Sequence, residues 1–220
     1  MKIKLIPVIE IGYNNQGIAV PKYPYWENQD VWFEYRNKTL QKAGFKDEFK
    51  PYLKGSPFFE PKEITDGNLK KIVFDHTESL RNGEYERYQA CCLFGGYVLR
   101  IGEKDQYFPQ CCGTLADIKY WGKMSQGIDS YYEGHPAPMP KFKFTKIIFD
   151  FSVEENEERF EPIPSSTKLE INRKALVLAG EAAKSELKEL TERVIKINRE
   201  MNLGIDRIED LLIWGDLNQE

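Results

Sequence analysis

Apolar residues recur at steps of three and four along the segment from Arg173 to Met201. Because an α-helix has about 3.6 residues per turn, this spacing places them on one face. They are Leu176, Ala179, Ala183, Leu187, Leu190, Val194, Ile197 and Met201. The pattern predicts an amphipathic helix about 43 Å long, which needs a broad apolar surface to cover it. The small alanines near its start favour packing across a sheet over a coiled coil with a second copy.

Strand-like alternation of apolar and polar residues runs from Arg87 to Phe94 and again from Tyr97 to Ile101. Asn82-Gly83 precedes the first run, and Asn-Gly between two such runs is typical of a type I′ hairpin. The expected partner strand is Lys71–Leu80. Tyr107–Cys112 is expected to return along Tyr97–Ile101. These segments predict a three-stranded antiparallel meander.

Local signals predict the other elements. Asn28 or Asp30 can cap a helix that stops at Gly44, and Thr114 with Asp117 has the spacing of a capping box. The apolar phase slips within Phe142–Phe151, which predicts either a bulged strand or one covered on both faces. The remaining expected elements are strands at Ile3–Ile11, Ile18–Val20 and Lys168–Ile171 and helices at Leu115–Lys123 and Asp206–Trp214.

Together these elements predict an α+β fold. A mostly antiparallel sheet of five to seven strands should be covered on one face by the long C-terminal amphipathic helix. A chain of 220 residues is long enough for one sizeable core. We therefore expect a single α+β domain over residues 1–220.

Composition and charge argue against several classes of function. The formal net charge of −4 argues against nucleic acid as a partner, because such proteins usually carry a basic patch. No apolar run approaches the roughly 20 residues of a membrane span, so no membrane partner is expected. The N-terminal apolar stretch alternates and lacks a small-residue cleavage site, which favours a strand over a signal peptide. With too few cysteines for a disulfide scaffold, these features predict a cytoplasmic protein.

The cysteines form two adjacent pairs, Cys91-Cys92 and Cys111-Cys112. Zinc motifs usually separate their ligands by two to four residues, and neighbours on a strand point to opposite faces. We therefore expect buried reduced thiols, with no metal and no other cofactor. A cysteine nucleophile would need a histidine base, and the predicted strand pairing places only His76 near Cys91.

Aromatic residues gather in two proline-rich segments. Tyr25 and Trp26 lie in one of them, and Tyr131 and Tyr132 lie just before the other, which contains His135. Exposed tyrosine and tryptophan favour protein interfaces because they combine large area with a polar group. These five residues are the predicted protein-binding site, and the glutamate-rich segment 154–161 is a further candidate contact.

No phosphate-binding loop, nucleophile elbow, metalloprotease motif or dinucleotide fingerprint occurs in the chain. We therefore expect a protein-binding module without catalytic activity, whose partner is another protein. A small acidic chain that lacks catalytic motifs and is rich in loop aromatics is typical of toxin-neutralising immunity proteins. Two alternatives remain: an enzyme with a cysteine and histidine site assembled from separated segments, and a small-ligand or carbohydrate binder that uses Trp26 and Tyr25. The sequence leaves the oligomeric state open.

Overall fold

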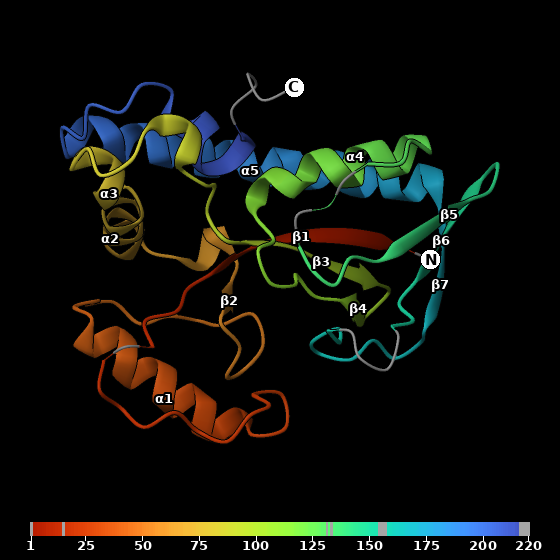
Figure 1. Cartoon of the computed structure of the whole chain (residues 1–220), viewed down its shortest axis with the longest axis horizontal. Coiled ribbons are helices and arrows are strands. Elements are labelled where there is room, and N and C mark those ends of the chain that lie inside the picture. Colours follow the sequence, from red (N-terminus) through yellow and green to blue (C-terminus); the bar gives the residue numbers. More distant parts are fainter. Residues whose placement is uncertain (1, 15, 131, 133, 154–157, 216–220) are drawn as a thin grey trace. The chain divides into compact units, whose positions relative to one another are not determined.

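The computed structural model describes all residues except 1, 15, 131, 133, 154–157 and 216–220. Within the described residues, seven antiparallel strands lie in two sheets and the long helix α5 packs against β1, which confirms the predicted fold class. Figure 1 labels these strands and helices. The strands are β1 (Ile3–Glu10), β2 (Phe58–Phe59), β3 (Gly95–Ile101), β4 (Lys104–Tyr107), β5 (Met139–Phe142), β6 (Lys146–Asp150) and β7 (Lys168–Asn172). The α-helices are α1 (Gln29–Lys42), α2 (Asp66–His76), α3 (Glu78–Arg81), α4 (Ile118–Gln126) and α5 (Arg173–Glu200).

The first sheet has the strand order β2-β1-β3-β4, and the second has the order β5-β6-β7. Hairpins connect β3 to β4 and β5 to β6, as the registers Ile101↔Lys104 and Phe142↔Ile147 show. Within the described part of the chain, no helix combines the length and apolar character that a membrane span requires.

The chain divides into two compact units. The first unit comprises residues 1–7 and 94–189, and the second comprises residues 8–93 and 190–220. Strand β1 and helix α5 each contribute to both. The expectation of a single domain stays a prediction.

An aromatic core fills the first unit. The Trp121 ring of α4 lies 5.6 Å from Phe149 of β6 and 6.0 Å from Tyr107 at the end of β4, measured between ring centroids. Phe160 packs edge-on against Phe151 at 5.2 Å. Each ring removes a large apolar area from water, so this core packs α4, the end of β4 and the segment after β6 against one another.

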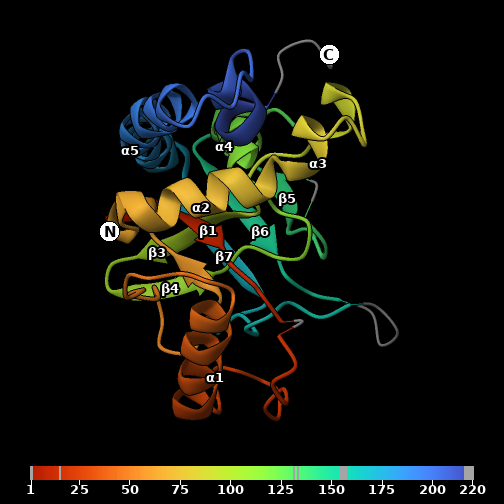
Figure 2. The ribbon, with the colours of Figure 1, turned by 90° about the vertical axis from the view of Figure 1, so that its left-hand side faces the viewer.

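In the second unit, helices α1 and α2 run in clearly different directions (Figure 2). Helix α1 begins after Asn28, and Gly44 follows it with a positive φ of 93°, as the stop signal predicted. The predicted side-chain cap is wrong, because the Asn28 side chain donates to the Pro24 carbonyl oxygen at 3.0 Å and does not accept from the first turn of α1. Tyr25, Trp32 and Tyr35 form a buried aromatic cluster on this helix and the loop before it.

The predicted hairpin through Asn82-Gly83 is wrong. Lys71–Leu80 belongs to helices α2 and α3, and 87–89 forms a short 3₁₀ helix in place of a strand. Thr65 caps α2 by accepting a hydrogen bond from the Asn68 amide at 3.2 Å. Gly83, with a φ of 69°, follows the end of α3. The same tolerance of positive φ that suits a hairpin turn also suits a helix C-terminus.

The phase slip in Phe142–Phe151 has a different cause from the two that the sequence suggested. The segment contains a hairpin, in which β5 ends at Phe142 and β6 begins at Lys146. The strand at 168–172 and the long helix from Arg173 are confirmed. At the predicted capping box, the Thr114 amide donates to the Asp117 carboxylate at 3.0 Å, whereas the buried Thr114 hydroxyl has no hydrogen-bond partner among the described residues. Residues 18–20, where a strand was expected, form no regular element. Asn172 caps α5, accepting a hydrogen bond from the Ala175 amide at 3.2 Å.

Candidate functional site: a cysteine and histidine cluster

Two loops of the first unit meet beyond the end of β4. Cys111 and His135 form an isolated antiparallel bridge, in which the His135 amide donates to the Cys111 carbonyl oxygen at 3.0 Å. On the other side of the cysteines, the Gly95 amide of β3 donates to the Gly113 carbonyl oxygen at 2.9 Å. Backbone hydrogen bonds therefore hold the Cys111-Cys112 segment on both sides.

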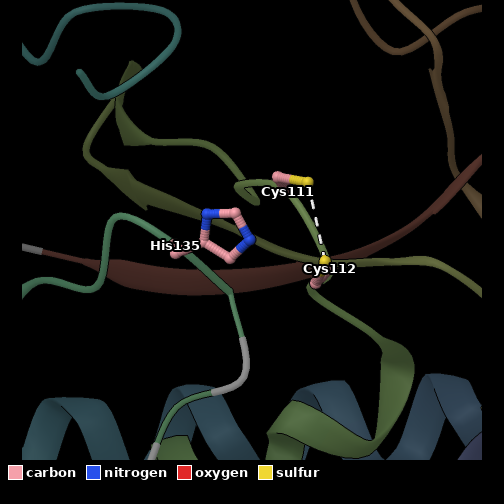
Figure 3. Close-up of side chains that lie close together, drawn as sticks. All are labelled: Cys111, Cys112 and His135. Atoms are coloured by element: carbon pink, nitrogen blue, oxygen red, sulfur yellow. Dashed lines mark hydrogen bonds between the residues drawn. The ribbon is translucent and has the colours of Figure 1, made fainter. Parts of the chain in front are cut away.

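The two thiols lie close together because of the backbone at Cys112. Its φ of 66° is left-handed, so the alternation of an extended strand breaks at this residue. The two sulfur atoms lie 3.6 Å apart (Figure 3). The expectation that one thiol of each pair is turned away therefore fails at Cys111 and Cys112, because it assumed a regular strand.

His135 completes the cluster. Its Nδ1 contacts the Glu158 carboxylate, and the other ring nitrogen is directed toward Cys112 (Figure 3). The ligand atoms of Cys111, Cys112 and His135 all lie within 4.8 Å of one another, and all three residues are exposed. The hydrogen bond to Glu158 raises the pKa of His135, and a hydrogen bond to Cys112 acts in the same direction.

The spacing of these donors suits a metal ion. Two sulfurs bound at about 2.3 Å to a tetrahedral zinc lie about 3.8 Å apart, which is close to the 3.6 Å between Cys111 and Cys112. Two thiolates and one imidazole leave one coordination position open. A carboxylate on the second ring nitrogen of a ligating histidine is a common outer contact of metal sites, and Glu158 occupies that place.

Buried groups below the cluster fix its position. Gln110, which precedes the cysteines, is buried and hydrogen-bonded to the Glu161 backbone. A Cβ at Gly113 would lie 2.8 Å from the Gly95 carbonyl oxygen, so this close approach requires glycine. Burial raises the pKa values of Tyr107 and Tyr132, whose hydroxyl groups are hydrogen-bonded at 2.9 Å.

The structure places the five predicted protein-binding residues in different surroundings. Tyr25 and Tyr132 are buried, so neither offers much surface to a partner. Trp26 is half-buried, and His135 is exposed in the cysteine cluster. Tyr131 lies outside the described residues, as does part of the glutamate-rich segment.

The second pair of cysteines lies in the other unit. Cys92 is buried as expected, whereas Cys91, Cys111 and Cys112 are exposed, which corrects the expectation of buried thiols for these three. None of the four, all of them described, forms a disulfide.

The predicted neighbours Cys91 and His76 do meet, although not on adjacent strands. His76 Nε2 lies 4.0 Å from the Cys91 sulfur and 2.9 Å from its carbonyl oxygen. A carbonyl only accepts, so this nitrogen carries a hydrogen and cannot take a proton from the thiol. Burial also lowers the His76 pKa. This geometry favours a structural role for the pair.

Sequence reasoning identified His135 but assigned it to an aromatic surface. The sequence places Glu158 only in a charged segment, because no spacing rule connects it to a histidine 23 residues earlier. The pair of adjacent cysteines is the sequence feature that could have indicated the cluster. The positive φ at Cys112 directs both thiols toward the same side.

No family model, curated protein or solved structure matches this chain.

Proposed function

We propose that this protein binds a thiophilic transition-metal ion, with zinc as the reference ion, through Cys111, Cys112 and His135. The observation that carries this proposal is the convergence of two sulfurs and an imidazole nitrogen within 4.8 Å of one another. Thiolate and imidazole donors select zinc or copper over magnesium and calcium, which prefer oxygen ligands.

Glu158 has an orienting role in this proposal. Its contact with Nδ1 of His135 fixes the ring and leaves Nε2 for the metal. Because the three ligands are exposed, water or a ligand from solution can reach the fourth position. Such an open site differs from a closed structural zinc site, in which protein supplies all four ligands.

Competition with a chromophoric zinc chelator tests the proposal. We expect one zinc ion per chain, and affinity that falls in Cys112→Ser and His135→Ala by more than the roughly 10- to 100-fold typical of an outer contact. The matched control is the double variant Cys91→Ser/Cys92→Ser, which keeps the cluster and should bind like the wild type. Unchanged zinc affinity in His135→Ala would contradict the assignment of this histidine as a ligand. Loss of zinc binding in the control would place the site at Cys91 and Cys92.

The same residues support the enzyme alternative. Cys112, His135 and Glu158 are ordered as the thiol, imidazole and carboxylate of a nucleophilic site. Alkylation of the metal-free protein separates the two functions. If Cys112 alone is alkylated rapidly, and at the same rate with and without zinc, a nucleophile is favoured. If one equivalent of zinc protects both Cys111 and Cys112 from alkylation, a metal site is favoured.

Protein recognition, as in a toxin-neutralising immunity protein, is the second candidate function. A specific surface in the second unit supports it. Tyr23 is 47% exposed and contacts half-buried Trp26 edge-on at 5.3 Å, and Trp26 in turn contacts buried Tyr25 at 5.0 Å. This anchored aromatic surface can present large area with little loss of side-chain entropy.

A comparison of matched variants tests recognition through this surface. In a cross-linking experiment, the wild type should recover a protein partner that neither Trp26→Ala nor Tyr23→Ala recovers. Phe144→Ala, which removes a 95% exposed aromatic ring elsewhere, should keep it. Equal recovery with all variants would contradict the assignment. Glycan binding that is lost only in Trp26→Ala would instead favour the carbohydrate alternative.

A further inference from the structure

We propose that Cys111 and Cys112 are also a two-electron redox site, in which a hydroperoxide oxidises them to a disulfide between neighbouring residues. The release of metal on oxidation rests on the metal-binding function proposed above. Formation of the disulfide itself does not.

The thiol geometry supports this inference. The sulfurs lie 3.6 Å apart in exposed side chains, so a small oxidant can reach them. A disulfide bond of about 2.05 Å requires them to approach by about 1.5 Å. The left-handed backbone at Cys112 already brings both side chains to one side, so rotation of the side chains supplies much of this movement.

The position of the cysteines in the chain predicts a labile disulfide. Neighbouring Cα atoms lie about 3.8 Å apart across a trans peptide, below the usual range of roughly 4.4–6.8 Å for disulfides. Strained and exposed disulfides have higher reduction potentials than structural ones. We therefore expect mild thiol reductants to reverse the oxidation.

The reaction balances in two steps. One thiol sulfur attacks the hydroperoxide, the O–O bond breaks, and a sulfenic acid and an alcohol or water form. The second thiol sulfur then attacks the sulfenic sulfur, the S–O bond breaks, and water leaves as the disulfide forms. Each cysteine loses one electron, and the hydroperoxide gains two. In the metal-bound form, two protons from solvent replace the thiol protons.

Oxidation removes two of the three metal ligands. Disulfide sulfurs are uncharged and bind zinc poorly, because the thiolate is the metal ligand. His135 alone then remains at the site, so the metal should leave.

The experiment treats the reduced, zinc-loaded full chain with one equivalent of hydrogen peroxide in the absence of air. Intact mass, peptide mapping and zinc release to a chromophoric chelator are measured together. We expect the loss of two hydrogen masses, a disulfide mapped to Cys111 and Cys112, release of one zinc ion, and reversal by glutathione. Cys91→Ser/Cys92→Ser should behave like the wild type, and Cys111→Ser should form no intramolecular disulfide.

The outcomes distinguish this inference from the proposed function. If zinc never binds but the mapped disulfide forms, metal binding fails and the redox site stands. If zinc binds and the thiols stay reduced, gain oxygen atoms or pair with Cys91 or Cys92, the redox inference is overturned and metal binding stands.

Discussion

Gln110 binds the backbone of Glu161 through both ends of its side-chain amide. Its Nε2 donates to the Glu161 carbonyl oxygen at 3.1 Å, and its Oε1 accepts from the Glu161 amide at 2.8 Å. Gln110 immediately precedes Cys111, and Glu161 lies three residues after Glu158. This pairing therefore connects the segment that carries the thiols to the segment that carries the carboxylate.

Replacing Gln110 with methionine should destabilise the fold and weaken metal binding together. The side chain is buried, and its loss leaves the Glu161 backbone groups without these partners, at a cost of about 1–3 kcal/mol. Chemical denaturation and zinc competition measure the two effects. Gln126→Met, at an exposed position at the end of α4, is the control and should change neither. A Gln110→Met protein with unchanged zinc affinity would show that the connection does not position the site.

Glu158→Gln should weaken zinc binding without unfolding the protein. The amide loses the negative charge that orients His135, and outer contacts of this kind change metal affinity by roughly 10- to 100-fold. The Glu158 side chain is 66% exposed, so we expect little change in the free energy of unfolding. Glu103→Gln, which removes an exposed carboxylate in the β3–β4 turn, is the matched control. The same affinity in both variants would remove Glu158 from the site.

Tyr107 and Tyr132 should be energetically coupled. The Tyr107 hydroxyl donates to the Tyr132 hydroxyl at 2.9 Å in a buried setting. Removing either hydroxyl leaves the other without this partner, which costs about 1–3 kcal/mol. The double variant Tyr107→Phe/Tyr132→Phe should cost less than the sum of the single variants, because no unpaired hydroxyl then remains. Denaturation curves of the four proteins test this, and strict additivity would contradict it.

Stability should fall at high pH because of the same tyrosines. Burial raises the pKa values of Tyr107, Tyr120 and Tyr132 in the folded state. The unfolded tyrosines release their protons near pH 10, so above about pH 10 the unfolded state binds fewer protons than the folded state. The contribution of these protonated tyrosines to the free energy of unfolding is complete below that pH, and it is lost as the pH rises toward their pKa values in the folded state.

The decline can reach about 1.4 kcal/mol per pH unit for each such group. Denaturation between about pH 8 and about pH 11 should show a shallower decline in Tyr107→Phe/Tyr132→Phe than in the wild type. Equal slopes would mean that these two hydroxyl groups ionise alike in both states.

Much of the fold follows from short-range patterns. The helix from Arg173 was predictable from its own periodicity and from Asn172, which caps it. Strand β1 and helix α1 were also predictable from local signals, although β1 buries residues 5–9 without the predicted alternation. Helix α2 was not predictable, because Asn82-Gly83 has the pattern of a hairpin turn as well as that of a helix end. Leu69, Ile72 and Val73 are buried on one helical face, a spacing that competed with the turn signal.

The cluster depends on contacts that no local pattern contains. Cys111 and His135 are 24 residues apart, and the bridge between them is isolated from every named strand. His135 was predictable as a candidate because only two histidines occur in the chain. The shared direction of the thiols depends on the φ of Cys112, a conformation that the sequence does not indicate for cysteine.

X-ray absorption spectroscopy of the zinc-loaded protein tests metal binding by the cluster most directly. We predict a first shell of two sulfur atoms at about 2.3 Å and nitrogen or oxygen atoms at about 2.0–2.1 Å, with the imidazole signature of one histidine. The shell should be unchanged in Cys91→Ser/Cys92→Ser. A shell of nitrogen and oxygen alone, or one of four sulfurs, would contradict a site built from Cys111, Cys112 and His135.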